Sequence, residues 1–161
     1  MTKYRAALQV LTALVCVGVL TIAGFAADNF SGTWKLNLEK SQYNPGPPPR
    51  SLTSTLEIMG DTANFTFDGY DSNGESIVPG ELSIKLDGQD YPIADDPTRD
   101  TVAIKKIDDY TMEQTNKKNG KVTTITRTVY AQDGKSRTAT TTGTNVQGQS
   151  VKDVAFFDRL R

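Results

Sequence analysis

From residue 28 to the C-terminal residue, apolar and polar positions alternate in short runs. In the first run Trp34, Leu36 and Leu38 fall on one face of an extended chain, and polar residues fall on the other. Alternation with a period of two is typical of a strand that is buried on one face only. Further runs of this kind cover residues 56–58, 65–67, 77–86 and 102–107, a short run around Met112, and residues 122–130, 137–142 and 151–157. The pattern predicts an all-β domain and no convincing helix in this part of the chain.

Short turn motifs separate these runs. Asn119-Gly120 and Asp133-Gly134 are two-residue signals for tight hairpins, and Asn73-Gly74 and Asp87-Gly88 are similar. Sequential hairpins place neighbouring strands antiparallel, and a meander of this length closes naturally into a barrel because closure removes exposed edges. We therefore predict an antiparallel meander that closes into a β-barrel of about 8–9 strands. A two-sheet β-sandwich is the alternative.

The first 27 residues differ in composition from the rest of the chain. They contain 19 apolar residues and only two charges, Lys3 and Arg5, which precede an apolar stretch from residue 6 to about residue 23. Gly24-Phe25-Ala26 then offers the small residues that a signal peptidase recognises. We expect a helical signal peptide over residues 1–26, a single domain over 27–161, and export to the periplasm or the extracellular space. The alternative is an uncleaved anchor, because residues 6–27 are long enough to cross a bilayer.

Residues 28–161 carry 16 basic and 19 acidic side chains and contain neither His nor Cys. This composition excludes thiol nucleophiles, disulfides, triads based on His, and the usual Cys/His sites for zinc or haem. The slightly negative charge balance gives no reason to expect nucleic acid as a partner. We expect no cofactor and no metal, and no stable membrane span once the signal peptide has been removed.

The motif Phe30-Ser31-Gly32-Thr33-Trp34 resembles the opening of lipocalin-like barrels, whose first strand carries a Gly-x-Trp element. The stretch through Tyr43-Asn44-Pro45 and the runs at 90–93, 107–109 and 143–145 are similar to a set of small exported bacterial proteins of unknown function. This resemblance implies a calyx-type barrel over nearly all of residues 28–161, and it implies no activity. It also implies that Gly32 and Trp34 close the barrel floor, with Arg159 packed across the Trp ring and Arg127 as the second choice.

An enzyme built from this domain would have to use carboxylates, Lys, Tyr or Ser. The acidic residues form two clusters, one of Asp68, Asp71 and Glu75 and the other of Asp95, Asp96 and Asp100. Both clusters lie among Gly, Asn or Pro, where acids commonly occupy solvated turns. We therefore assign no catalytic residue and favour a non-enzymatic protein, with a carboxylate enzyme such as a glycoside hydrolase as a minor alternative.

Threonine occurs 18 times among residues 28–161 and gathers at 123–128 and 138–144. Because both faces of these strands contain Thr, several hydroxyls must point inward, where buried hydroxyls need partners. One interpretation is a partly polar, partly hydrated cavity. The other is that Thr favours strand formation, while Trp34, the Phe residues and the rows of Leu and Ile fill the core.

The function that this pattern favours is the binding of a small apolar or amphiphilic molecule inside the barrel. The residues expected to contact its apolar part lie in alternating runs and are Phe65, Phe67, Leu82, Ile84 and Ile104. Thr126 and Thr140 are expected to orient its polar end. The alternative is a structural or envelope-interaction protein with a filled core and no ligand. A continuous internal cavity would favour the first function.

Overall fold

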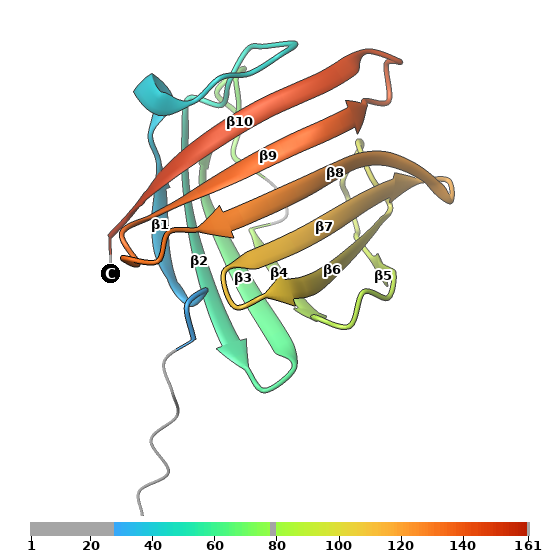
Figure 1. The fold of residues 1–161 in the computed structure, drawn as a ribbon. Coiled ribbons are helices and arrows are strands. Elements are labelled where there is room, and N and C mark those ends of the chain that lie inside the picture. The colour runs from blue at the N-terminus through green and yellow to red at the C-terminus, as the bar shows by residue number, and fades with distance from the viewer. Residues whose placement is uncertain (1–27, 78–79, 161) are drawn as a thin grey trace, which may run out of the picture.

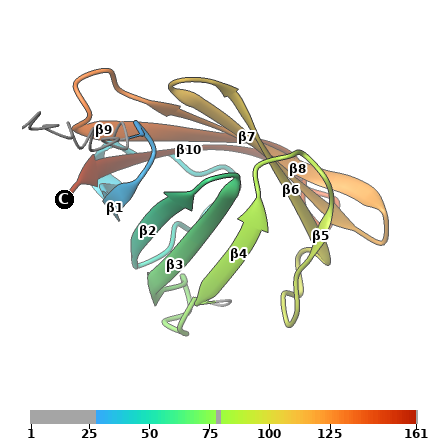
Figure 2. The ribbon, with the colours of Figure 1, turned by 90° about the horizontal axis from the view of Figure 1, so that it is seen from below.

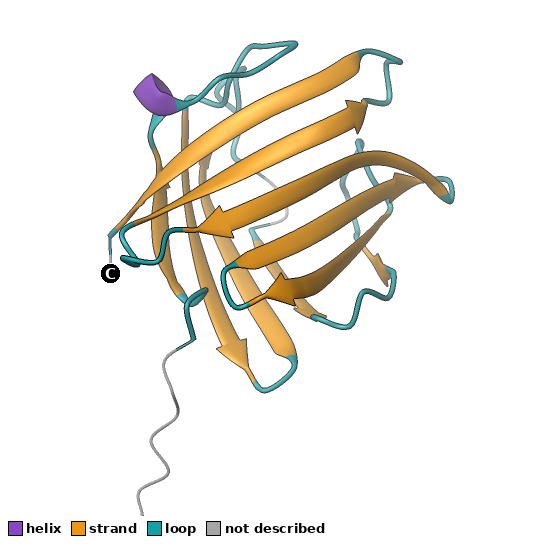
Figure 3. Cartoon of the chain, in the orientation of Figure 1, coloured by secondary structure: helices purple, strands orange, loops and turns teal. Residues whose placement is uncertain are grey.

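The computed structural model describes residues 28–77 and 80–160, and the predicted signal peptide lies outside the described residues. This part of the chain forms ten strands and one short 3-10 helix (Figure 3). In chain order they are β1 (Gly32–Leu36), η1 (Leu38–Lys40), β2 (Ser51–Met59), β3 (Thr62–Tyr70), β4 (Glu81–Lys85), β5 (Tyr91–Pro92), β6 (Thr101–Asp108), β7 (Thr111–Lys118), β8 (Lys121–Tyr130), β9 (Ser136–Thr144) and β10 (Ser150–Arg159). Within the same residues, no helix has the length and apolar character that crossing a bilayer requires.

All ten strands belong to one antiparallel sheet, in which neighbours in the chain are also neighbours in space except at β4 and β5. β1 pairs with both β2 and β10, and Trp34 lies opposite Arg159 in the second of these ladders. The strand order is therefore β4-β3-β2-β1-β10-β9-β8-β7-β6-β5, and the sheet curls into a barrel (Figure 1). Among the described residues no ladder joins β4 to β5, and Figure 2 shows these strands as two separate edges.

These findings confirm an all-β antiparallel meander and correct two details of the prediction. The sheet has ten strands rather than eight or nine, because the two-residue strand β5 is too short to produce an alternating pattern. The barrel is nearly closed rather than closed, because no ladder joins β4 and β5 in the part of the chain that the structure describes. A two-sheet sandwich is wrong, since all ten strands form one continuous sheet.

Several apolar residues of the alternating runs lie outside the core, and Leu38 and Ile107 are two of them. Leu38 was expected to continue the first strand, but β1 ends at Leu36 and the side chain of Asn37 accepts a hydrogen bond of 3.2 Å from the Lys40 amide, which caps η1. Leu38 is consequently exposed. Ile107 is also exposed, because it lies three residues after the inward Ile104 and so falls on the opposite face of β6.

Two glycines permit close contacts between strands. Gly143 in β9 has φ +144° and Gly69 in β3 has φ +157°, values that favour glycine. A Cβ atom at Gly143 would collide with the carbonyl oxygen of Thr123, and one at Gly69 would collide with that of Ser51. Glycine at these positions therefore lets each strand bend and still pair with its neighbour as the sheet curls.

The core gathers at one end of the barrel, around Trp34. The Trp34 and Phe30 side chains are 0% and 1% exposed, and Tyr130 packs edge-on against both rings. Leu56 and Phe157 complete this cluster from β2 and β10. Large aromatic side chains bury much apolar area, so this cluster makes that end of the barrel a dense floor. The rest of the buried core extends along the barrel to β4 and β6.

Candidate ligand-binding site

The inner faces of the strands enclose a cavity of about 140 Å³ above this floor. Its apolar wall consists of Phe65 and Phe67 from β3, Ile104 from β6, Met112 from β7, Ala139 from β9 and Phe157 from β10. The rings of Phe65 and Phe67 stack with their centroids 6.0 Å apart and their planes 2° from parallel. Residues two apart in a strand share a face, which explains why both rings point inward.

A second hollow of about 150 Å³ continues the cavity toward β4. It shares Phe65, Phe67 and Ile104 with the first cavity and adds Leu82 from β4 and Arg99 from the β5–β6 connection. Leu82 also lines a groove of about 360 Å³ on the opening between β4 and residues 92–95. The Leu82 side chain therefore borders both the interior and the seam where the sheet is open.

Strand β8 turns its polar side inward and its apolar side outward. Thr126 and Thr128 line the cavity, whereas Ile125 and Val129 are exposed on the outer surface. The Thr126 and Thr141 hydroxyls lie 2.8 Å apart, so these inward groups bond to each other across the β8–β9 ladder. This arrangement places polar groups inside the cavity without leaving these two hydroxyls unsatisfied.

The end of the interior away from Trp34 is polar and electrically balanced. Arg99 Nε donates to Asp96 Oδ2 at 2.8 Å, and Arg99 Nη1 donates to Asn116 Oδ1 at 2.9 Å. Burial alone would raise the pKa of Asp96, but hydrogen bonds from Thr98 and the charge of Arg99 outweigh it and lower the pKa of this carboxyl below its usual value. Gln114 Nε2 joins the network by donating to the same Asn116 oxygen.

Arg137 lies at the opposite end of the cavity, beside the floor. It faces Phe157 on β10 and Tyr130 on β8 in the two ladders of β9. Arg137 Nη1 donates to the Tyr130 hydroxyl at 3.1 Å, and Arg137 Nη2 reaches across the interior to the Ser54 hydroxyl of β2. The Arg137 side chain is buried and lines the cavity wall.

Trp34 and Arg159 hold the floor together. The Arg159 guanidinium lies 4.9 Å from the centre of the Trp34 ring, and Arg137 approaches the same ring at 5.2 Å. Arg159 also donates hydrogen bonds to the carbonyl oxygens of Ser31 and Gly134. The preceding Gly32 begins β1. The structure thus places Arg159 across Trp34, and it places Arg127, the second choice, on the exposed side of β8.

The structure brings some of the residues predicted to contact a ligand together and separates others. Phe65, Phe67, Ile104 and Thr126 line the main cavity, and Leu82 lines its continuation. Ile84 is 3% exposed and packs in the core, outside both hollows. The placement of Thr140 inside the barrel is wrong: Thr140 faces outward beside Ile125 and Arg127, because the alternation in β9 puts Arg137, Ala139 and Thr141 inside.

Sequence reasoning missed the polar residues that line the interior, namely Arg99, Gln114, Tyr130 and Arg137. A signal for Arg137 is present in the chain. Asp133-Gly134 fixes a hairpin, and its register sets Tyr130 opposite Arg137. Tyr130 is aromatic and lies on the face opposite Val129, which is exposed. Residues that pair across a hairpin point to the same face, so Arg137, the partner of Tyr130, also points inward.

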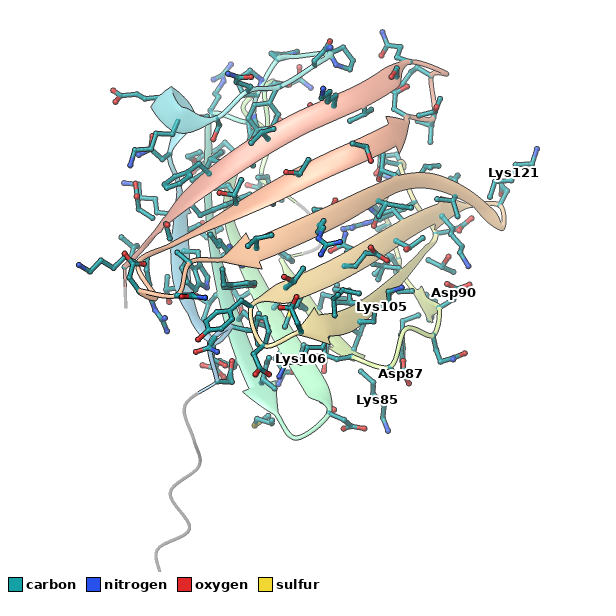
Figure 4. All side chains as sticks on the ribbon, viewed as in Figure 1. Lys85, Asp87, Asp90, Lys105, Lys106 and Lys121 are labelled. Carbon is teal, nitrogen blue, oxygen red and sulfur yellow. The ribbon has the colours of Figure 1, made fainter. Side chains whose placement is uncertain are left out.

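Acidic residues of both sequence clusters make local hydrogen bonds. Asp71 closes a turn by accepting hydrogen bonds from the Asn73 and Glu75 amides, and Asp96 accepts one from the Thr98 hydroxyl. Among the labelled lysines, Lys105 and Lys121 are exposed on the outside of the barrel, whereas the Lys106 ammonium lies 5.0 Å from the centre of the Phe30 ring (Figure 4). Over residues 28–77 and 80–160 there is no group of three or more His, Cys, Asp or Glu side chains arranged to hold a metal ion.

The strand order and the hollow interior define the fold as a nearly closed, lipocalin-like antiparallel β-barrel. Among solved structures, the chain is similar to the zebrafish ileal bile acid-binding protein in complex with cholic acid. The TM-score is 0.54, the alignment covers 83% of this chain and 100% of that chain, and the sequences are 16% identical. At this identity the likeness concerns the fold. No protein-family model and no curated protein sequence matches the chain.

Proposed function

We propose that this protein is an exported, non-enzymatic barrel that binds a small apolar or amphiphilic molecule in its interior. The observation that carries the proposal is the cavity above the Trp34 floor, which is bounded by the stacked Phe65 and Phe67 rings. Ligand sites are typically concave and apolar, with a few polar groups that fix orientation. The structural neighbour, named as a bile acid-binding protein, supports an interior ligand for a barrel of this kind.

The size of the cavity supports a compact ligand. Its volume is about 140 Å³, and an apolar cavity of roughly 150 Å³ is enough to hold a benzene-sized molecule. Apolar contact contributes roughly 25 cal/mol per Å² of buried area, so a ligand of this size can gain several kcal/mol from the Phe65, Phe67 and Ile104 wall. The second hollow toward Leu82 offers room for an extension of such a ligand.

The chemistry of the cavity wall supports binding rather than catalysis. Among the described residues that line it, Arg137 is the one side chain charged at neutral pH, and none is a carboxylate. General acid–base catalysis in glycosidases needs a pair of carboxyl groups flanking the reacting bond. Export is proposed from the composition of residues 1–26, with the barrel acting in the periplasm or outside the cell.

The alternative is a structural or envelope-interaction protein, which the exposed Ile125 and Val129 on the outer face of β8 favour. The two functions differ in what the interior does. A fluorescent apolar dye should bind the folded wild-type barrel with saturable, one-to-one stoichiometry. Phe67→Ala should weaken this binding severalfold, because Phe67 lines both hollows.

Tyr70→Ala provides the matched control, since Tyr70 is an exposed aromatic residue on the same strand. Its dye binding should equal that of the wild type. Dye binding that Phe67→Ala leaves unchanged would place the dye on the outer surface. The absence of saturable uptake of dyes and amphiphiles by the wild type would favour the structural function instead.

A further inference from the structure

The guanidinium of Arg137 is buried inside the barrel and has no acidic partner. The residue is 8% exposed, and it donates hydrogen bonds to the neutral hydroxyls of Tyr130 and Ser54. The Nε atom is buried and has no hydrogen-bond partner, and no ion pair among the described residues includes Arg137. Arginine carries five N–H donors and does not lose its charge in proteins, so a full positive charge with unused donors remains at this site.

Three aromatic rings surround this charge. The guanidinium carbon lies 4.6 Å from the Phe157 ring centre, 5.2 Å from that of Trp34 and 5.7 Å from that of Tyr130. Cation–π contacts are each worth about 1–2 kcal/mol when desolvated, whereas removing an ion from water costs several kcal/mol even after relaxation. The rings hold the guanidinium in place and do not neutralise it.

None of the described residues in the remainder of the cavity wall supplies a negative charge to Arg137, so this site suits an anion. Beside Arg137 the wall consists of apolar side chains and neutral polar groups such as Gln114 and Thr126. The other inward arginine, Arg99, is already neutralised by Asp96. A singly charged ligand balances one guanidinium, whereas a dianion would leave a net negative charge in the same dry space.

We propose that the cavity takes a compact aryl monocarboxylate, with the carboxylate against Arg137 and the ring between Phe65, Phe67 and Ile104. The inference rests on the proposed interior binding and adds the class of ligand and its orientation. The planar guanidinium fork matches the geometry of a carboxylate, and a charge-assisted bond is stronger than a neutral one. The cavity of about 140 Å³ fits a single aromatic ring, and the Phe65–Phe67 stack offers that ring two faces.

Benzoate and benzamide test this assignment because they share a ring and differ in charge. Titrations of the wild-type barrel at pH 7, followed by NMR, should show benzoate binding at least tenfold tighter than benzamide. The ¹H–¹⁵N resonance of Arg137 Nε should shift and saturate with benzoate, because this donor has no partner in the free protein. A purely structural role for Arg137 would leave that resonance unchanged.

Variants test whether Arg137 causes the preference for benzoate over benzamide. Arg137→Met should bind benzoate no better than benzamide, and Arg137→Lys should keep part of the preference because it keeps the charge. Arg127→Met is the matched control: it removes the same charge from the exposed face of β8 and should bind benzoate like the wild type. If Arg137→Met does not fold, Arg137→Lys and the wild-type ligand pair still decide the question.

The outcomes separate this inference from the proposed function. Equal affinity of the wild type for benzoate and benzamide overturns the carboxylate assignment and leaves interior binding intact. Binding of an apolar dye with no binding of either ring compound also overturns the assignment. No saturable binding of the dye, benzoate or benzamide overturns the proposed function itself.

Discussion

The interior holds one arginine toward each end of the cavity, and the two arginines differ in the groups that surround their charge. Arg99 is bonded to Asp96 at 2.8 Å and to Asn116 at 2.9 Å, which makes an electrically balanced network. Arg137 touches hydroxyls and aromatic rings, and its charge has no acidic partner among the described residues. Arg137 is buried and Arg99 is partly exposed, and the two sites also differ in what compensates the charge.

This difference indicates two roles for the same side chain. A cation paired with a carboxylate fixes the 96–99 loop against β7, and its removal leaves an uncompensated acid. A cation without a carboxylate contributes less to folding, because the cost of its desolvation opposes its contacts. What remains is a positive potential inside an otherwise neutral cavity, which is a property of use to an anionic ligand.

The largest effect on stability is expected at Trp34, the residue of the floor whose ring contacts Arg137. Trp34→Ala should lower the free energy of unfolding by about 3–5 kcal/mol, the range for large aromatic truncations in cores. The mutation removes the ring on which both Arg137 and Arg159 stack. Denaturant unfolding measures the change, and Tyr70→Ala is the exposed aromatic control. A midpoint that hardly moves would mean that the floor does not depend on Trp34.

The next largest effect is expected at the balanced arginine. Arg99→Met should cost about 3 kcal/mol, since it leaves Asp96 buried without its cation. The lowered pKa of Asp96 means that its contribution is present above its ordinary pKa near 3.8 and disappears as the pH falls through the lowered value. Unfolding free energies measured from pH 6 to pH 2 should therefore fall more steeply in the wild type than in Arg99→Met.

The unbalanced arginine should matter less for folding. Arg137→Met should change the free energy of unfolding by less than about 1.5 kcal/mol, because the relief of a buried charge offsets the lost hydrogen bonds and ring contacts. The comparison of Arg137→Met with Arg99→Met in the same denaturant tests the contrast directly. A loss at Arg137 as large as that at Arg99 would show that Arg137 is chiefly a structural cation.

The smallest effect is expected at Tyr43, whose hydroxyl stays neutral to a higher pH than that of an ordinary tyrosine. Burial, and secondly the charge of Asp153, raise the pKa of Tyr43 to about 12. The stability linked to its neutral hydroxyl is present below the ordinary tyrosine pKa of 10.0 and is lost as the pH rises toward 12. Between these pH values the unfolding free energy of the wild type should fall more steeply than that of Tyr43→Phe. Parallel curves would contradict the raised pKa.

Alternation along the chain could predict the meander because burial on one face leaves a period of two in each strand. It failed where local chemistry overrode that period, at Leu38, where a cap ends β1. Phe65 and Phe67 were found because apolar residues in the same run share the inward face. The pattern gave no preference for one face at Thr140, since Thr occupies both sides of β9.

Arg137 shows why hydrophobicity alone could not predict the rest of the site. Charged residues normally lie outside, so a pattern of polarity assigns an arginine to solvent unless a partner is known. The groups that hold Arg137 come from Ser54, Tyr130 and Phe157, which are far apart in the sequence. Only strand register brings them together, and the inverted polarity of β8 hides that register from hydrophobicity alone.

Among the described residues no ladder joins β4 and β5, so the barrel is open along this seam. In a fully closed barrel, strand number and stagger set the circumference, so the width of the interior is fixed. In this open barrel, backbone hydrogen bonds do not fix the distance between β4 and β5. Leu82 lies on β4 at this opening and also borders the interior. The space available to a ligand is therefore bounded at this seam by side chains such as Leu82 rather than by backbone pairing.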